Sequence, residues 1–292
     1  LEKLEKNKQR DFFYLARNID ESLGREITAM NFQSVNAIQS YARFYPGGKA
    51  SAQSVGVVNI DGAGIEGIEY LYDQALAGES GYAKYLINPF GETIESIQRK
   101  EPTPGSDVQL TLDRSIQYIA YEALREGVKK TDAKSGVAVV LEVATGNIIA
   151  ATNYPSYNPD HVNKSARQTK NMRNKVFTDL YEPGSTFKPI ALAYVLENKS
   201  IGAKQTIQTQ PGEFKIGTNI IKDVRNYGRV TVDEVLIKSS NIGMSKLVLS
   251  TQKTLVPWLK DRFQVSQKSP RIFPGEPTST IIDKPKNFRI LS

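Results

Sequence analysis

The sequence of 292 residues predicts a mixed α/β (α+β) protein with two domains. Helix-like and strand-like periodicities follow one another over residues 107–152, which is the pattern of a mixed fold. A segment with two prolines and a glycine, residues 101–105, interrupts both periodicities and predicts a linker. The hydrophobic content of 39% is enough to bury a sizeable core. We therefore predict an N-terminal domain over residues 1–105 and a second domain over residues 106–292.

The elements follow in order from these patterns. The charged residues 1–23 predict a helix, and residues 24–105 predict short strands and turns. Residues 107–113 alternate like a strand. Residues 114–129 predict an amphipathic helix whose apolar face covers a sheet. That face is expected to consist of Ile116, Ile119, Ala120, Ala123 and Leu124.

A nearly continuous apolar run, residues 136–143, predicts a central strand. It ends in the turn residues Thr145, Gly146 and Asn147, so we expect it to pair as a hairpin with residues 147–152. Further along, residues 232–238 and 242–247 predict two helical segments with a short polar break between them.

Composition excludes several classes of function. The net charge is +7, but most of the excess lies in residues 251–292, without interleaved aromatic repeats. Such a basic segment is typical of a solvated surface rather than a base-stacking platform, so we expect no nucleic-acid partner. The absence of cysteine excludes disulfides and thiolate metal sites. The sequence contains no phosphate-binding loop, zinc spacing or dinucleotide fingerprint, and we expect no cofactor.

Ser185 and Lys188 form the first candidate catalytic pair. Pro183 and Gly184 break the chain before them, and apolar residues at helical spacing follow, which places Ser185 at a helix N-terminus. Lys188 lies one turn further on the same face. A lysine in a partly dry pocket loses proton affinity and can activate a serine hydroxyl. The alternative is that both are ordinary cap and surface residues.

His161 is the only histidine and lies in a polar loop, where a surface role is expected. A Ser-His-Asp triad would have to use it, so the scarcity of histidine favours lysine as the base.

Ser239 and Asn241 form the second constellation, in the polar break after residues 232–238. The Ser239 hydroxyl can relay a proton. The Asn241 amide can accept a hydrogen bond from a lysine and donate one to a substrate carbonyl. The alternative is a helix cap, for which serine and asparagine are common choices.

Together these motifs resemble the class B penicillin-binding proteins, most closely the septal-division peptidoglycan D,D-transpeptidases. The resemblance rests on residues 182–189 and 238–243, on residues 64–69 with Tyr72, Asp73 and Gly78, and on residues 136–159. It implies the penicillin-binding transpeptidase fold, an antiparallel sheet flanked by helices, behind an N-terminal non-catalytic pedestal domain.

The resemblance also implies an activity, partners and a location. Ser185 would be the acylated nucleophile, Lys188 its base, and Ser239 and Asn241 the second active-site motif, which also binds substrate and beta-lactams. The implied partners are peptidoglycan stem peptides, beta-lactam antibiotics and division-machinery membrane proteins, including a glycosyltransferase. The implied location is the inner membrane, with a single-pass anchor upstream and the catalytic part in the periplasm.

One departure from the family pattern concerns its third motif, K-T-G or K-S-G, which is expected well after Asn241. The residues at 253–255 lack the glycine, and Lys134-Ser135-Gly136 precedes the nucleophile, where we expect a turn entering a strand. The C-terminal part of the fold is therefore expected to be missing from these residues, and the chain as given to acylate poorly. A serine beta-lactamase or D,D-carboxypeptidase and a non-catalytic division scaffold remain the alternatives.

Overall fold

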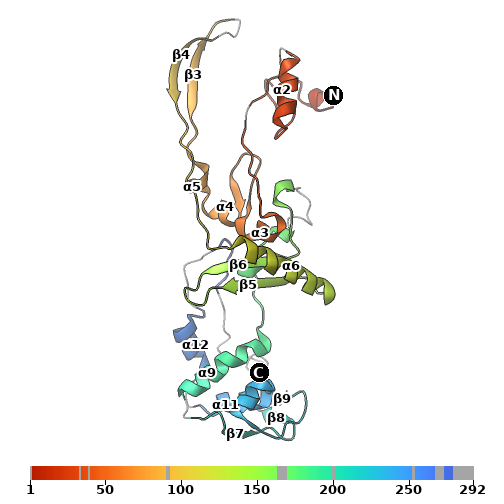
Figure 1. Ribbon diagram of the computed structural model, residues 1–292, viewed down its shortest axis with the longest axis vertical. Coiled ribbons are helices and arrows are strands. Elements are labelled where there is room, and N and C mark those ends of the chain that lie inside the picture. The colour runs from red at the N-terminus through yellow and green to blue at the C-terminus, as the bar shows by residue number, and fades with distance from the viewer. Residues whose placement is uncertain are drawn as a thin grey trace. The chain divides into compact units, whose positions relative to one another are not determined.

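Helices and antiparallel strand pairs alternate along the chain in the computed structural model (Figure 1). The structure describes residues 2–32, 34–38, 40–89, 93–162, 170–198, 201–251, 254–266 and 273–278. The chain divides into two compact units, Leu1–Val176 and Phe177–Ser292. Every strand pair in the described residues is antiparallel. None of the described helices is long and apolar enough to cross a bilayer.

The first unit contains the elements α1 (Glu2–Lys6), α2 (Glu21–Ala29), α3 (Gly48–Val55), β1 (Val57–Val58), β2 (Gly64–Glu66), α4 (Gly67–Leu71), α5 (Asp73–Ala77), β3 (Tyr82–Ile87), β4 (Thr93–Lys100), α6 (Arg114–Lys130), β5 (Gly136–Leu141), β6 (Ile148–Tyr154) and the 3-10 turn η1 (Pro159–His161). The short α8 (Lys175–Thr178) lies at the sequence position where the units divide.

The second unit contains the 3-10 turn η2 (Gly184–Phe187), α9 (Lys188–Asn198), β7 (Thr206–Gln208), β8 (Glu213–Ile216), β9 (Asn219–Lys222), β10 (Arg229–Thr231), α10 (Val232–Ile237), α11 (Asn241–Leu249) and α12 (Leu255–Phe263).

The predicted single helix over residues 1–23 is wrong. Two helices, α1 and α2, are separated by an irregular segment. The backbone N–H of Arg10 closes a turn onto the Asn7 carbonyl at 3.0 Å, and Asn18 has a left-handed φ of +53°. Asparagine favours such turns over helix interiors because its side chain bonds to nearby backbone and tolerates positive φ. The charge pattern alone did not reveal these breaks.

The predicted hairpin around Gly146 is confirmed. Strands β5 and β6 pair in antiparallel register from Gly136 opposite Tyr154 to Leu141 opposite Ile148. Gly146 has a φ of +77°, and its N–H donates to the Glu142 carbonyl at 2.8 Å. Glycine fits this position because it adopts positive φ at little cost.

The predicted helix over residues 114–129 is confirmed as α6, but its buried face differs from the prediction. The buried residues are Gln117, Tyr121 and Val128, whereas Ile119 is 65% exposed. The Gln117 amide donates to the carbonyls of Ala50 and Ala151 at 2.7 and 2.8 Å and accepts from the Ala151 N–H at 2.8 Å. These bonds satisfy a buried polar side chain, so the helix turns a glutamine inward in place of an isoleucine.

The strand predicted over residues 107–113 is absent. This segment makes isolated contacts with β6, where the Asp113 N–H donates to the Ile149 carbonyl at 2.9 Å and the Thr111 hydroxyl to the Ile148 carbonyl at 2.6 Å. Asp113 then turns away to cap α6, because its carboxylate accepts from the Ile116 N–H at 2.8 Å. A capping residue ends the extended segment before a ladder can form.

Strands β3 and β4 form a long two-stranded ribbon (Figure 1). Two register shifts interrupt the pairing. The ribbon carries several exposed apolar side chains, namely Tyr82, Tyr85, Leu86, Ile94 and Ile97.

The core of the second unit lies among α9, α10, α11 and α12. Tyr194 and Val195 of α9 are fully buried, and Phe187 and Ile190 pack against the same cluster, so the predicted apolar face of this helix is confirmed. The edge of the Trp258 ring contacts Tyr194. The remaining buried members are Ala191, Leu192, Val230, Val232, Val235, Met244, Leu247, Leu255 and Leu259. This packing fixes the start of α9 against the start of α11.

Candidate active site

Ser185 lies in the 3-10 turn η2, directly before α9. Gly184 has a φ of +58°, and the Thr186 hydroxyl donates to the Pro183 carbonyl at 2.6 Å. The Lys188 N–H donates to the Ser185 carbonyl, which joins the turn to the helix. Ser185 is exposed, and its hydroxyl makes no hydrogen bond to the described residues. The serine is therefore placed at a helix start, as predicted, with its hydroxyl accessible.

Lys188 is the buried residue of the pair, with only 3% of its surface exposed. Its ammonium Nζ donates to the Ser239 carbonyl at 2.6 Å, to the Ser239 hydroxyl at 3.1 Å and to Asn241 Oδ1 at 2.5 Å. A lysine ammonium has three protons, so all three are used. The structure thus brings Lys188, Ser239 and Asn241 together, whereas the predicted contact between Lys188 and the Ser185 hydroxyl is not a hydrogen bond in this structure.

The surroundings of Lys188 lower the pKa of its amine. Burial lowers the pKa of the amine, and the negative charge of Asp223 partly opposes that change by raising the pKa. Burial is the larger effect because it removes the charged form from water. A lysine with a lowered pKa supplies more free amine near neutral pH, which is what a general base requires.

Ser239 lies in a turn between two helices. The first helix, α10, ends at Ile237, and Ser239 has a left-handed φ of +51°. Ser240 is then the N-cap of α11, and its hydroxyl accepts from the Gly243 N–H at 2.9 Å. The change of direction at Ser239 aims both its carbonyl and its hydroxyl at Lys188. The predicted polar break therefore provides two of the three acceptors of the lysine.

Asn241 has a defined amide orientation. Its Nδ2 donates to the Lys222 carbonyl at 2.9 Å, so its Oδ1 faces Lys188. Since an amide nitrogen carries two protons, one remains for a ligand. Asn241 can thus hold the lysine and a substrate carbonyl at the same time.

Asp223 is a functional candidate that sequence reasoning missed. It follows β9, and its Oδ1 accepts from the N–H groups of Asn241 and Ile242 at 2.5 and 3.0 Å. Its Oδ2 accepts from the Ser240 hydroxyl at 2.7 Å. An aspartate after a short strand carries no local signal of such a role, because its partners lie 17 to 19 residues further along the chain.

The residues set aside in the sequence lie where expected. His161 is exposed in η1, and Gly136 opens β5 in the first unit. Lys253 and residues 279–292, where the search for a third motif falls, lie outside the described residues. No group of His, Asp and Glu side chains in the described part of the chain is arranged to hold a metal ion.

Two family models match the chain. The model of the penicillin binding protein transpeptidase domain matches residues 136–290, more than half of the chain. The model of the penicillin-binding protein dimerisation domain matches residues 1–110. The chain therefore belongs to the class B penicillin-binding proteins and has their transpeptidase fold behind an N-terminal dimerisation domain. The first compact unit includes parts of both matches, and the boundary at residue 105 stays a prediction.

The relatives are peptidoglycan D,D-transpeptidases. The chain is 39% identical over 250 residues to the Pseudomonas aeruginosa protein "Probable peptidoglycan D,D-transpeptidase PbpC", covering 85% of this chain and 44% of that protein. It is 33% identical over 252 residues to the peptidoglycan D,D-transpeptidase FtsI of Escherichia coli K12, covering 86% and 42%. The chain thus spans less than half the length of these relatives.

The structural comparisons agree with this family. Penicillin-binding protein 3 of Mycobacterium tuberculosis matches with a TM-score of 0.71 and 27% identity, over 85% of this chain and 53% of that one. The same protein complexed with ampicillin matches with a TM-score of 0.69 and 28% identity, over 81% and 49%.

Proposed function

We propose that the protein is a serine-type peptidoglycan D,D-transpeptidase that crosslinks stem peptides during cell division. The observation that carries the proposal is the buried Lys188 amine. It lies one helical turn after an accessible serine and is held by Ser239 and Asn241. The family and the names of the relatives support the reaction class.

In the proposed reaction, Ser185 Oγ attacks the carbonyl of the penultimate D-alanine while the neutral Lys188 amine takes the hydroxyl proton. The peptide bond breaks, and the Ser239 hydroxyl passes a proton to the departing amine of the terminal D-alanine and regains one from the Lys188 ammonium. An amine of a neighbouring stem then attacks the acyl-serine, forms the crosslink and restores the Ser185 hydroxyl. Asn241 holds Lys188 and the substrate amide. The chain's own side chains supply every proton transfer.

The same chemistry makes the protein a target of beta-lactams, which imitate the donor peptide and stall as acyl-serine. The relative complexed with ampicillin supports this part of the proposal. We further propose that the catalytic part lies in the periplasm behind a membrane anchor. There it acts with division-machinery membrane proteins that include a glycosyltransferase.

The test compares two S-x-x-K serines in the protein expressed from its complete gene. Ser185→Ala is expected to abolish labelling by fluorescent penicillin because it removes the nucleophile. Ser250 begins the second S-x-x-K, and its hydroxyl bonds to the Leu247 carbonyl at 2.6 Å. Ser250→Ala should therefore label normally. Retained labelling of the Ser185 variant would mean that another residue is the nucleophile.

The 292 residues by themselves are expected to acylate slowly. We find no K-T-G or K-S-G after Asn241, and the loss of one oxyanion donor alone costs about 10²–10³ in kcat. The lifetime of the adduct then separates the alternatives. A persistent acyl-serine supports the transpeptidase, rapid turnover indicates a beta-lactamase or carboxypeptidase, and no labelling indicates a scaffold.

A further inference from the structure

We propose that Asp223 is a positioning residue for the reaction, the anchor that holds the turn Ser239–Asn241 against Lys188. This inference rests on the proposed function, since the turn supplies the partners of the candidate base. Asp223 itself makes no hydrogen bond to Lys188, and it acts through the residues that do.

The carboxylate of Asp223 is placed at the start of α11. Both of its oxygens are used, by the N–H groups of Asn241 and Ile242 and by the Ser240 hydroxyl. The first N–H groups of a helix have no partner within the helix, and the positive end of the helix dipole favours an anion there. Asp223 therefore fixes the helix end that carries Asn241.

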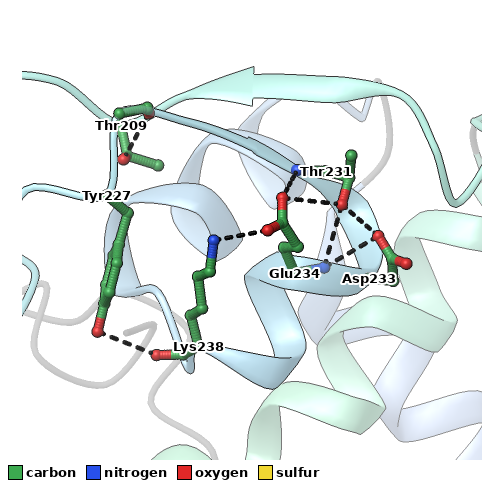
Figure 2. A network of polar contacts seen from close by, with 7 residues as sticks. Thr209, Tyr227, Thr231, Asp233, Glu234 and Lys238 are labelled. Atoms are coloured by element: carbon green, nitrogen blue, oxygen red, sulfur yellow. Dashed lines mark hydrogen bonds and ion pairs between the residues drawn. The ribbon is translucent and has the colours of Figure 1, made fainter.

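The residues around Asp223 hold the same turn at other points. The Lys222 carbonyl accepts from Asn241 Nδ2, which sets the direction of the amide. The Tyr227 hydroxyl donates to the Lys238 carbonyl at 3.3 Å, one residue before Ser239 (Figure 2). Figure 2 also shows the Lys238 ammonium paired with Glu234 in α10. The end of β9 and the connection to β10 thus hydrogen-bond to the chain on both sides of Ser239.

Ser239 requires such support. Its φ of +51° lies in a region that non-glycine residues seldom adopt, and strained conformations persist where the surroundings over-determine them. If these hydrogen bonds were lost, the backbone of Ser239 would adopt a more common conformation. Its carbonyl and hydroxyl would then move away from Lys188. The lysine would then lose two of its three acceptors.

Asp223 also acts on Lys188 through its charge. The groups in the described residues that hydrogen-bond to the lysine are neutral. The neighbouring cations Lys222 and Lys238 are paired with Glu213 and Glu234, each at 2.6 Å. Removing the Asp223 charge should therefore lower the pKa of Lys188 further, because that charge raises it. Loss of the Ser239 acceptors would lower the pKa in the same direction, whereas a disrupted fold that exposes Lys188 to water would raise it towards the ordinary value of 10.5.

The experiment compares Asp223→Asn with Asp233→Asn in the protein expressed from its complete gene. Asp233 is the matched control. Its carboxylate accepts a backbone N–H at the start of α10, at 3.0 Å from Glu234 N, and has no bond to the turn Ser239–Asn241. We expect Asp223→Asn to lower the second-order rate of acylation by fluorescent penicillin about ten- to a hundred-fold. The control should acylate like the wild type.

The second readout is the titration of Lys188, followed by NMR of its 13Cε signal, which does not depend on catalysis. The midpoint should move to lower pH in Asp223→Asn and stay in place in Asp233→Asn. If the acylation rate or the Lys188 midpoint of Asp223→Asn matches the wild type, the proposal is overturned. A wild-type protein that titrates as described but is not acylated at Ser185 would overturn the proposed function alone.

Should Asp223→Asn fail to fold, Ser240→Ala removes one of the three bonds of Asp223, together with the N-cap bond from the Gly243 N–H, and leaves the charge. That variant should acylate several-fold more slowly, with the Lys188 midpoint nearly unchanged. Acylation of Ser240→Ala at the wild-type rate would also overturn the proposal that Asp223 anchors the turn.

Discussion

At the scale of single residues, Lys188 is a buried amine whose three hydrogen-bond partners are all neutral oxygens. A structural cation in such a place would be costly without a carboxylate partner. A base, by contrast, benefits from the burial, because it spends part of its time uncharged. The surroundings of this lysine therefore suit a general base better than a permanently charged structural residue.

This argument predicts the effect of Lys188→Arg. Arginine keeps the charge and the donors but does not lose its proton in proteins. The acylation rate should fall about 10²–10⁴-fold, the usual contribution of a general base. Stopped-flow acylation by a chromogenic beta-lactam measures it.

Lys246→Arg is the control, because the Lys246 ammonium also donates to a backbone carbonyl, that of Gln208, but lies in α11 and has no hydrogen bond to Ser239 or Asn241. If the Lys188→Arg protein acylated at the wild-type rate, another residue would have to be the general base.

The sequence predicted these residues because their signals are local. Ser185 and Lys188 lie one helical turn apart, and Ser239 and Asn241 share one short break. Asp223 carries no such signal, since only the folding of β9 against α11 brings it to its partners. The left-handed backbone of Ser239 was not predictable either, because serine gives no hint of positive φ.

At the scale of elements, α10 begins with a reciprocal capping box. The Thr231 hydroxyl accepts from the Glu234 N–H, and the Glu234 carboxylate accepts from the Thr231 N–H at 2.9 Å (Figure 2). The bond from Lys238 lowers the pKa of Glu234 to about 2. Because this pKa is depressed, the stabilisation is present above the ordinary value of 4.5 and is lost as the pH falls towards 2.

Thr231→Ala should lower the free energy of unfolding by about 0.5–2 kcal/mol, the usual cost of a lost N-cap. Urea titration followed by the fluorescence of Trp258, the single tryptophan, measures it. Thr231→Ser keeps the hydroxyl and should stay near the wild type. Equal losses in both variants would mean that the threonine methyl, and not the cap, carries the effect.

Elements with strong local patterns were predicted well. The hairpin of β5 and β6 and the helices α6, α10 and α11 follow from periodicity and turn residues. The predictions failed where polar residues decided the outcome. The turn at Asn7 follows the end of the N-terminal helix, Asp113 ended the extended segment, and the hydrogen bonds of Gln117 set the buried face of α6.

At the scale of the whole molecule, one polar residue links segments that match different family models. Gln117 bonds to Ala50 in α3, within residues 1–110, and to Ala151 in β6, within residues 136–290. The Thr152 hydroxyl adds a bond to the same Ala50 carbonyl at 3.2 Å. The first compact unit therefore depends on both segments.

Gln117→Ala should destabilise this unit by about 1–3 kcal/mol, because the buried Ala151 N–H loses its side-chain acceptor and the carbonyls of Ala50 and Ala151 each lose one of their donors. Hydrogen exchange of the α6 amides measures the loss. Gln109→Ala is the control, since Gln109 is exposed. Unchanged exchange in the Gln117 variant would mean that water replaces the amide.

The shared first unit also has a practical consequence for anyone dividing the gene. Ser54 and Tyr157 hydrogen-bond across the same junction, to the Ala151 and Ala52 carbonyls at 2.7 and 2.9 Å. A fragment stopping at residue 110 would expose the buried side of α3 to water and would remove the side-chain partners of its carbonyls. A fragment cut after Val176 would retain these partners, so the useful place to cut is set by these bonds and not by the end of a family match.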